Sequence, residues 1–207
     1  MAKSNLEEIR DTEVVVFTDG SCWPNPGGSG GWGFVAVHGK FEKEGHGGIT
    51  TTTTNVAELT AVREALKMTR ITNLPITVVT DSQYVRNVFQ KWAGIWAKRG
   101  WVTSDGGIVA NRKLIEEILV LIKENVSVRF LWMRGHQTGT DAWVGFNNRA
   151  DHLASMGRKS VDKSDTLAKV IGVVLLGLLA HWGGGSNIQK LSPLSCLGVD
   201  YVDNVSV

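Results

Sequence analysis

Four carboxylates in matching local settings constrain the fold of this chain more than any other feature. Asp19 follows the apolar run Val14–Phe17, and Asp81 follows a second apolar run. Glu58 lies one turn into a predicted helix, and Asp151 lies in another predicted helix near residue 150. Acidic residues at strand ends and in adjoining helical turns can converge at one edge of a sheet. Because clustered anions repel one another and hard oxygen ligands suit magnesium or manganese, the pattern predicts a divalent-cation site.

Each of these acids also has an ordinary structural interpretation. Asp81 could cap the helix that follows it, and Glu58 could close a capping box with Asn55. Asp19 could stabilise the turn after it, and Asp151 could be a solvent-facing helical residue. Taken one at a time, these interpretations stay open, and for Glu58 and Asp81 capping and metal binding need not exclude each other.

The order of predicted strands and helices defines the fold class. The predicted strands are Glu13–Thr18, Trp32–His38, Phe41–Ile49, Ile76–Thr80 and Val126–Met133. The predicted helices begin at Asn55 and Ser82 and cover Leu114–Asn125 and Asn147–Met156, and a proline- and glycine-rich loop covers Trp23–Gly31. This order predicts an α/β fold with a five-stranded mixed sheet and helices on both faces, in which the first, fourth and fifth strands are parallel and central. Ligands of such sheets gather at the C-terminal ends of the strands, where Asp19 and Asp81 fall.

Composition narrows the class of partner and the compartment. The net charge is only +2, from 22 basic and 20 acidic residues. If four of those acids bind cations, the remaining surface is more basic than the total, which favours a nucleic-acid partner. Cys22 and Cys196 are too few for a disulfide framework, and the polar N-terminus has no apolar signal-peptide core. We therefore expect a cytoplasmic protein.

Several short motifs occur together in an order that resembles the type 1 ribonuclease H family. TDGS contains Asp19, an N-x-x-EL helix start contains Glu58, and TDSQYV contains Asp81, followed by WAKRGW, GH and AD. The resemblance extends from Val14 to Arg158. It implies a ribonuclease H-like fold and an endoribonuclease that hydrolyses the RNA strand of RNA–DNA hybrids by a two-metal-ion mechanism.

The resemblance also implies the residues of the catalytic centre. Asp19, Glu58, Asp81 and Asp151 would hold two Mg²⁺ ions, for which Mn²⁺ could substitute, with Asp19 bridging them. One ion would activate a water molecule and the other would stabilise the departing 3′ oxygen. His136 lies in a glycine-flanked loop where the family's histidine assists proton transfer or product release. As a lone histidine it could also be an ordinary surface residue.

Two groups of substrate contacts follow from the same resemblance. The first resembles the family's basic protrusion, which grips the DNA strand, and consists of Trp92, Trp96, Lys98, Arg99 and Trp101. The alternative for this segment is an amphipathic helix with a tryptophan core face. The second group would contact hydroxyls and base edges in the minor groove on the RNA side, with Thr53 contacting a phosphate on the DNA side. Its other members are Gly20, Ser21, Asn25, Asn55 and Gln83.

The chain extends beyond the region of resemblance. We expect a catalytic domain at residues 1–160 and a C-terminal extension at residues 161–207, with a short apolar segment at residues 167–182. Its unbroken apolar core, Val170–Ala180, is shorter than the roughly 17–25 residues that span a bilayer. A buried or self-associating helix is the first interpretation, and attachment to a membrane or to a protein partner is the alternative. We expect the protein to be a monomer.

Two other functions are compatible with parts of the pattern. The chain could be a catalytically inactive module that binds RNA–DNA hybrids, or a related metal-dependent nuclease of the resolvase or integrase type. TDSQYV together with WAKRGW disfavours the second. The four intact acids disfavour the first, because a pure binder has no use for clustered anions near a phosphate.

Overall fold

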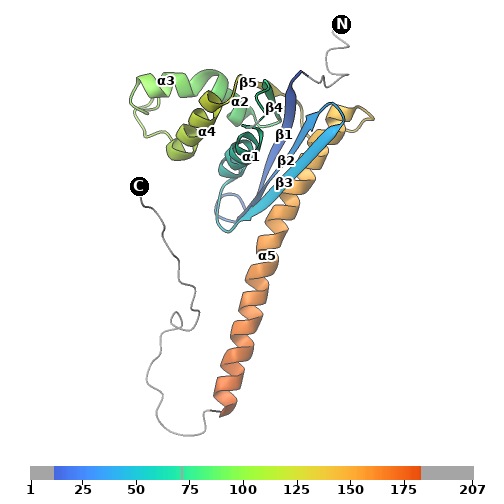
Figure 1. The fold of residues 1–207 in the computed structure, drawn as a ribbon. Helices are drawn as coiled ribbons and strands as arrows, with labels where there is room; N and C mark the ends of the chain where they lie inside the picture. The colour runs from blue at the N-terminus through green and yellow to red at the C-terminus, as the bar shows by residue number, and fades with distance from the viewer. Residues whose placement is uncertain (1–11, 71, 183–207) are drawn as a thin grey trace, which may run out of the picture. The chain divides into compact units, whose positions relative to one another are not determined.

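The computed structural model describes residues 12–70 and 72–182 of the chain (Figure 1). The strands are β1 (Val14–Trp23), β2 (Ser29–His38), β3 (Phe41–Ile49), β4 (Ile76–Thr80) and β5 (Val128–Trp132). The helices are α1 (Thr54–Thr69), α2 (Gln83–Asn87), the π-helix η1 (Val88–Trp92), α3 (Ala93–Lys98), α4 (Arg112–Glu124) and α5 (Ala142–Trp182).

The predicted five-stranded mixed sheet is confirmed. The strands lie in the order β3-β2-β1-β4-β5. β2 pairs antiparallel with β1 and β3, whereas β4 pairs parallel with β1 and β5. The prediction that the parallel strands are all central is wrong for β5, which forms an edge of the sheet because, within the described residues, β4 is the one strand that pairs with it.

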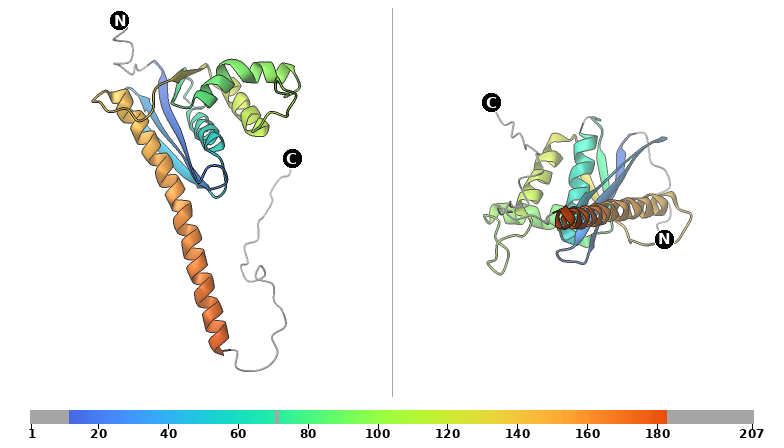
Figure 2. Two further views of the ribbon diagram at one scale, coloured as in Figure 1. Left: turned by 180° about the vertical axis from the view of Figure 1, so that it is seen from behind. Right: turned by 90° about the horizontal axis from the view of Figure 1, so that it is seen from below.

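Helices cover both faces of the sheet. α1 and α4 lie on one face and the beginning of α5 lies on the other (Figures 1 and 2). Successive side chains of a strand point to opposite faces, so Val16 packs with α1 and α4 while Phe17 packs with α5. Phe17 meets Trp143 edge-on, with ring centroids 5.2 Å apart, and Phe146 at 5.4 Å. Burial on both faces explains why the first strand is an unbroken apolar run.

Glycines of β1 and β2 allow two helices to approach the sheet closely. A Cβ atom on Gly20 would overlap the α1 backbone at Glu58, and one on Gly33 would overlap the α5 backbone at Ala150. Side chains at these two positions would therefore push away the helices that carry Glu58 and Asp151.

The first two strands are longer than the sequence pattern predicts. Residues Asp19 to Trp23 pair with residues Gly33 to Ser29, so both ends of the predicted loop Trp23–Gly31 belong to a hairpin. This hairpin continues beyond Thr18, where pairing with β4 ends. The sheet therefore carries a two-stranded projection beside the C-terminal ends of its parallel strands.

The capping alternatives for two of the acids are wrong. Ser82, and not Asp81, caps α2, because its hydroxyl accepts a hydrogen bond from the Val85 amide at 3.3 Å. Thr53 caps α1 by accepting from the Val56 amide at 3.3 Å, so a capping box between Asn55 and Glu58 does not form. Both acids are therefore free for another role. The helix predicted from Ser82 is divided into α2, η1 and α3.

The last helix is much longer than the predicted Asn147–Met156. It runs from Ala142 to Trp182, and the chain divides into two compact units between Thr166 and Leu167. Before that division, Val161 is buried and the Asp162 carboxylate accepts hydrogen bonds from Ser29 and Arg158. Residues 183–207 of the predicted extension, including Cys196, lie outside the described residues.

Between residues 12 and 182, leaving out residue 71, the structure contains no helix whose length and apolar character would suffice to cross a membrane.

Candidate active site

Two of the predicted acids lie where parallel strands end. Asp19 follows Thr18, the last residue of β1 that pairs with β4, and its Oδ1 accepts a hydrogen bond from the Gly20 amide at 2.7 Å. Asp81 directly follows β4, and its carbonyl oxygen accepts a hydrogen bond from the Trp132 indole at 2.8 Å. The two carboxylates therefore lie at the same edge of the sheet, as the strand pattern predicts.

Three of the four predicted acids form one group. Asp19, Glu58 and Asp81 each offer a carboxylate oxygen, and these atoms lie within 4.8 Å of one another. Glu58 reaches the group from α1, where the close contact at Gly20 brings the helix against β1. Asp19 and Glu58 are buried. The group thus brings together like charges from β1, α1 and the end of β4.

Burial and mutual repulsion make these carboxylates hard to ionise. Burial, followed by the charges of Asp81 and Asp151, raises the pKa of Asp19 to about 8. Burial, followed by the charge of Asp19, raises the pKa of Glu58 well above its usual range. Burial also raises the pKa of Asp81, although the nearby His136 counteracts the effect. A cation between the acids would reverse this penalty, because it favours the ionised forms.

The donor set fits a divalent cation with a preference for oxygen ligands. Glu58 Oε2 is buried and has no hydrogen-bond partner, although buried polar atoms are nearly always paired. It belongs to a group whose other members are also carboxylates. A hard cation would satisfy this oxygen and neutralise the repulsion in the same step. The three-acid group can therefore hold a metal ion.

Asp151 and His136 border this group. Asp151 lies on α5, and its side chain contributes to the raised pKa of Asp19. His136 Nδ1 lies 3.9 Å from Asp151 Oδ2, and its ring is largely exposed. A basic ring beside the acids, open to solvent, can exchange protons with water.

The residues predicted to contact RNA belong to several elements that also carry the acids or adjoin them. Ser21 is on β1, two residues after Asp19, and Gln83 is at the start of α2, two residues after Asp81. Asn25 is tied to the beginning of α1, because its Oδ1 accepts from the Thr54 amide at 3.1 Å. This bond places Asn25 beside Asn55, another predicted RNA contact, and beside Thr53, the predicted contact to a DNA phosphate. Asn25, Asn55 and Gln83 are exposed.

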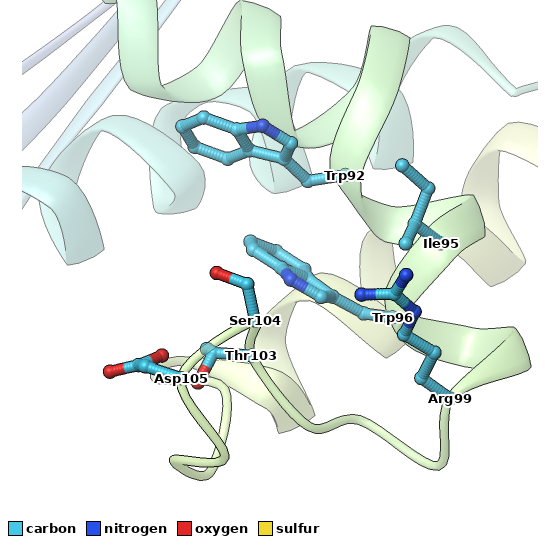
Figure 3. Close-up of a pocket in the computed structure, with 7 residues that line it drawn as sticks. All are labelled: Trp92, Ile95, Trp96, Arg99, Thr103, Ser104 and Asp105. Carbon is cyan, nitrogen blue, oxygen red and sulfur yellow. The ribbon is translucent and has the colours of Figure 1, made fainter.

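The predicted DNA-binding segment forms a pocket. Trp92 and Trp96, with ring centroids 5.6 Å apart, line a cavity of about 490 Å³ with Arg99 (Figure 3). Lys98 is exposed beside it. Trp101 differs from the other predicted contacts: it is only 8% exposed, packs in the core, and lies under the Arg112 guanidinium at 5.4 Å. Its described contacts are those of a core residue on which the segment packs.

Three residues near the acids were not predicted from the sequence to belong to the site. Trp132 binds the carbonyl of Asp81, and Gly135 packs against the Asp81 carboxylate. Asn147 is 2% exposed, and its amide lowers the pKa of Asp81 through a hydrogen bond. Asn147 precedes Asp151 by four residues on one helix, which places both on the same face, so this spacing was a usable signal.

Comparisons with known proteins find a matching family. The family model described as RNase H matches residues 11–159. A Neisseria meningitidis protein named Ribonuclease H is 40% identical over 147 residues, which are 71% of this chain and 96% of the relative. A Nitratidesulfovibrio vulgaris protein of the same name is 45% identical over 143 residues, covering 69% and 86%.

Solved structures resemble the fold. The solution structure of the PFV RNase H domain gives a TM-score of 0.60 at 26% identity, covering 71% of this chain and 94% of that domain. The crystal structure of LC9-RNase H1, described as a type 1 RNase H with the type 2 active-site motif, gives 0.62 at 27% identity, covering 72% and 73%. The predicted ribonuclease H-like fold is confirmed.

The raised pKa of Asp19 predicts how pH affects the stability of the metal-free protein. In the unfolded chain this carboxyl ionises near pH 4, whereas in the fold its pKa is about 8. Between these values the folded state holds a proton that the unfolded state has lost, so this group's contribution to stability falls as pH rises towards 8. We expect Asp19→Asn to raise the unfolding temperature in EDTA, more at pH 8 than at pH 5.

Thermal unfolding of both proteins from pH 5 to pH 9, with EDTA and with Mg²⁺, measures this difference. Mg²⁺ should stabilise the unsubstituted protein most at high pH, where the acids are ionised. A difference between the two proteins that does not change with pH would contradict the assigned pKa.

Proposed function

The chain belongs to the ribonuclease H family, and from this premise we infer that it is an endoribonuclease that hydrolyses the RNA strand of RNA–DNA hybrids. The convergence of Asp19, Glu58 and Asp81 within 4.8 Å carries the inference to this chain, because it supplies the metal site that such hydrolysis needs. The family match spans residues 11–159 and includes all of the acids.

We propose that Asp19, Glu58, Asp81 and Asp151 hold two Mg²⁺ ions and that Mn²⁺ can replace them. The ions would supply an activated water and stabilise the negative charge that develops on the departing 3′ oxygen. Asp19 is proposed as the shared ligand, because it belongs to the three-acid group and its carboxylate also interacts with Asp151. His136 is proposed to move a proton or to assist product release, since its ring lies beside Asp151 and is open to solvent.

We propose that the hybrid is held on two sides of the acids. Trp92, Trp96, Lys98 and Arg99 would hold the DNA strand, with cations on phosphates and indoles on deoxyribose faces. Thr53 would contact a DNA phosphate. On the other side, the RNA strand would be recognised by its 2′-hydroxyls across the wide minor groove. The proposed RNA contacts are Gly20, Ser21, Asn25, Asn55 and Gln83.

We also propose a role and a location for the parts that the family does not explain. Residues 161–207 would form an extension to the catalytic domain at residues 1–160, and its apolar segment at residues 167–182 would associate with another copy or partner. Leu167 and Ile171 support this, because both are exposed apolar residues of α5. A cytoplasmic location is proposed because Cys22, buried in the fold, is a free thiol.

Asp19→Asn should reduce hybrid cleavage to background while hybrid binding is retained or becomes tighter. The substitution removes a metal ligand and also one negative charge close to the scissile phosphate. Cleavage should be measured on labelled RNA–DNA hybrid, duplex DNA and duplex RNA, with Mg²⁺ and with EDTA. Glu124→Gln removes one exposed charge at the end of α4 and should cleave like the unsubstituted protein.

The substrate that is cleaved distinguishes the three candidate functions. Cleavage of duplex DNA would support the resolvase or integrase type of nuclease, and binding of hybrid without any cleavage would support an inactive module. Near-normal cleavage by Asp19→Asn at saturating Mg²⁺ would refute the two-metal assignment.

Replacing both Lys98 and Arg99 by Ala should weaken hybrid binding and flatten its salt dependence. Each lost phosphate contact should lower the slope of log K against log salt by roughly 0.9. The matched control replaces Lys40 and Lys43, two exposed lysines at the end of the β2–β3 hairpin away from Asp19. An unchanged slope combined with a slower saturated rate would place Lys98 and Arg99 at the catalytic centre instead.

A chain ending at Thr166 should fold and cleave hybrids like the full chain. This end point keeps Val161 and Asp162, which contact the sheet. In contrast to the monomer expected from the sequence, light scattering should find the full chain self-associated and the shorter chain monomeric, because an exposed apolar segment favours association. Flotation of only the full chain with phospholipid vesicles would replace self-association by membrane attachment, and unfolding of the shorter chain would refute the division into parts.

A further inference from the structure

The loop between β5 and α5 passes directly over Asp81. Its first residue, Met133, donates its amide to the Thr80 carbonyl at 3.1 Å, and Trp132 donates its indole to the Asp81 carbonyl at 2.8 Å. These two bonds tie the start of the loop to the end of β4. The loop backbone at Gly135 therefore lies at a defined place beside the Asp81 side chain.

The space that a side chain at residue 135 would need is occupied by Asp81. A Cβ atom built on Gly135 would overlap Asp81 Oδ2 and would lie 3.0 Å from Asp81 Cγ and 3.3 Å from Asp81 Cβ. All three nearest atoms belong to this one side chain. The backbone of Gly135 is outside the left-handed region, so its conformation does not require glycine. The requirement comes from space alone.

We propose that Gly135 is a positioning residue for Asp81: the missing side chain leaves the volume in which the Asp81 carboxylate turns towards Asp19 and Glu58. This rests on the proposed metal site. Asn147 is buried and lies close enough to the Asp81 carboxylate to lower its pKa. The absence of a side chain at residue 135 leaves the Asp81 oxygen its place within 4.8 Å of the other two acids.

A methyl group at residue 135 would act on function more than on folding. The overlapping atom is the end of a side chain, and Asp81 can turn to another staggered rotamer without moving the backbone. That rotation would take its oxygen away from the shared cation. Removing the support of a metal ligand typically weakens metal binding about 10- to 100-fold.

Gly135→Ala can be compared with Gly139→Ala, a control in the same loop. A Cβ atom on Gly139 would meet nothing within 4 Å. Mn²⁺ binding to the full chain without substrate should be measured by electron paramagnetic resonance of the free ion, and folding by circular dichroism and thermal unfolding. We expect Gly135→Ala to fold normally and to bind Mn²⁺ at least tenfold more weakly. Gly139→Ala should match the unsubstituted protein.

Gly135→Ala should also be made in an Asp81→Ala background. There the added methyl meets no carboxylate, so it should change neither the remaining Mn²⁺ affinity nor the unfolding temperature. If Gly135→Ala unfolds the protein, relief of that defect in this background supports the contact with Asp81, and persistence of the defect refutes it. Unchanged Mn²⁺ affinity in Gly135→Ala alone refutes the positioning role while leaving the proposed function intact. Absence of Mn²⁺ binding by the unsubstituted protein would refute the metal site and this inference together.

Discussion

Repulsion between the carboxylates of Asp19, Glu58 and Asp81 destabilises the fold, and the rest of the structure has to offset it. Three acidic side chains held this close, two of them buried, oppose folding unless protons or cations neutralise them. The sheet supplies the compensation elsewhere, in apolar layers on both of its faces. The stability of this domain therefore comes from its two apolar cores, which offset the cost of the acidic group at the edge of the sheet.

Holding the acids in place requires close approach of the backbone, and this chain achieves it with glycines. Gly20 lets α1 approach β1, Gly33 lets α5 approach β2, and Gly135 lets the loop after β5 approach Asp81. The two helices carry the proposed metal ligands Glu58 and Asp151, and Asp81 is itself a proposed ligand. Glycine is costly in a strand because it loses more conformational freedom on folding than other residues. Its use at these positions indicates that the distances between elements matter more here than local propensity.

The sheet, the order of its elements and the three clustered acids could be predicted from the sequence. Apolar runs that end in Asp19 and Asp81 are a local pattern, and a local pattern can be recognised without the fold. What it did not reveal depends on contacts between distant residues. The hairpin beyond Asp19 could not be separated from a loop, since glycine and proline favour both. Trp101 belongs to a basic segment, yet its burial under Arg112 follows only from packing. The same holds for Gly135, whose necessity appears only when Asp81 is placed beside it.

Charge is divided between two regions of the fold. A polyanionic substrate is repelled by the acids at the sheet edge, and the exposed cations of α3 and its C-terminal end can offset this repulsion at a distance. Cations bound by the acids would remove the repulsion locally, at the one phosphate that lies over them. If the proposed contacts hold, substrate binding and bond cleavage would depend on different charges, and a hybrid would stay bound by Lys98 and Arg99 before the acids bind metal ions. Metal binding, and not hybrid binding, would therefore commit the protein to cleavage.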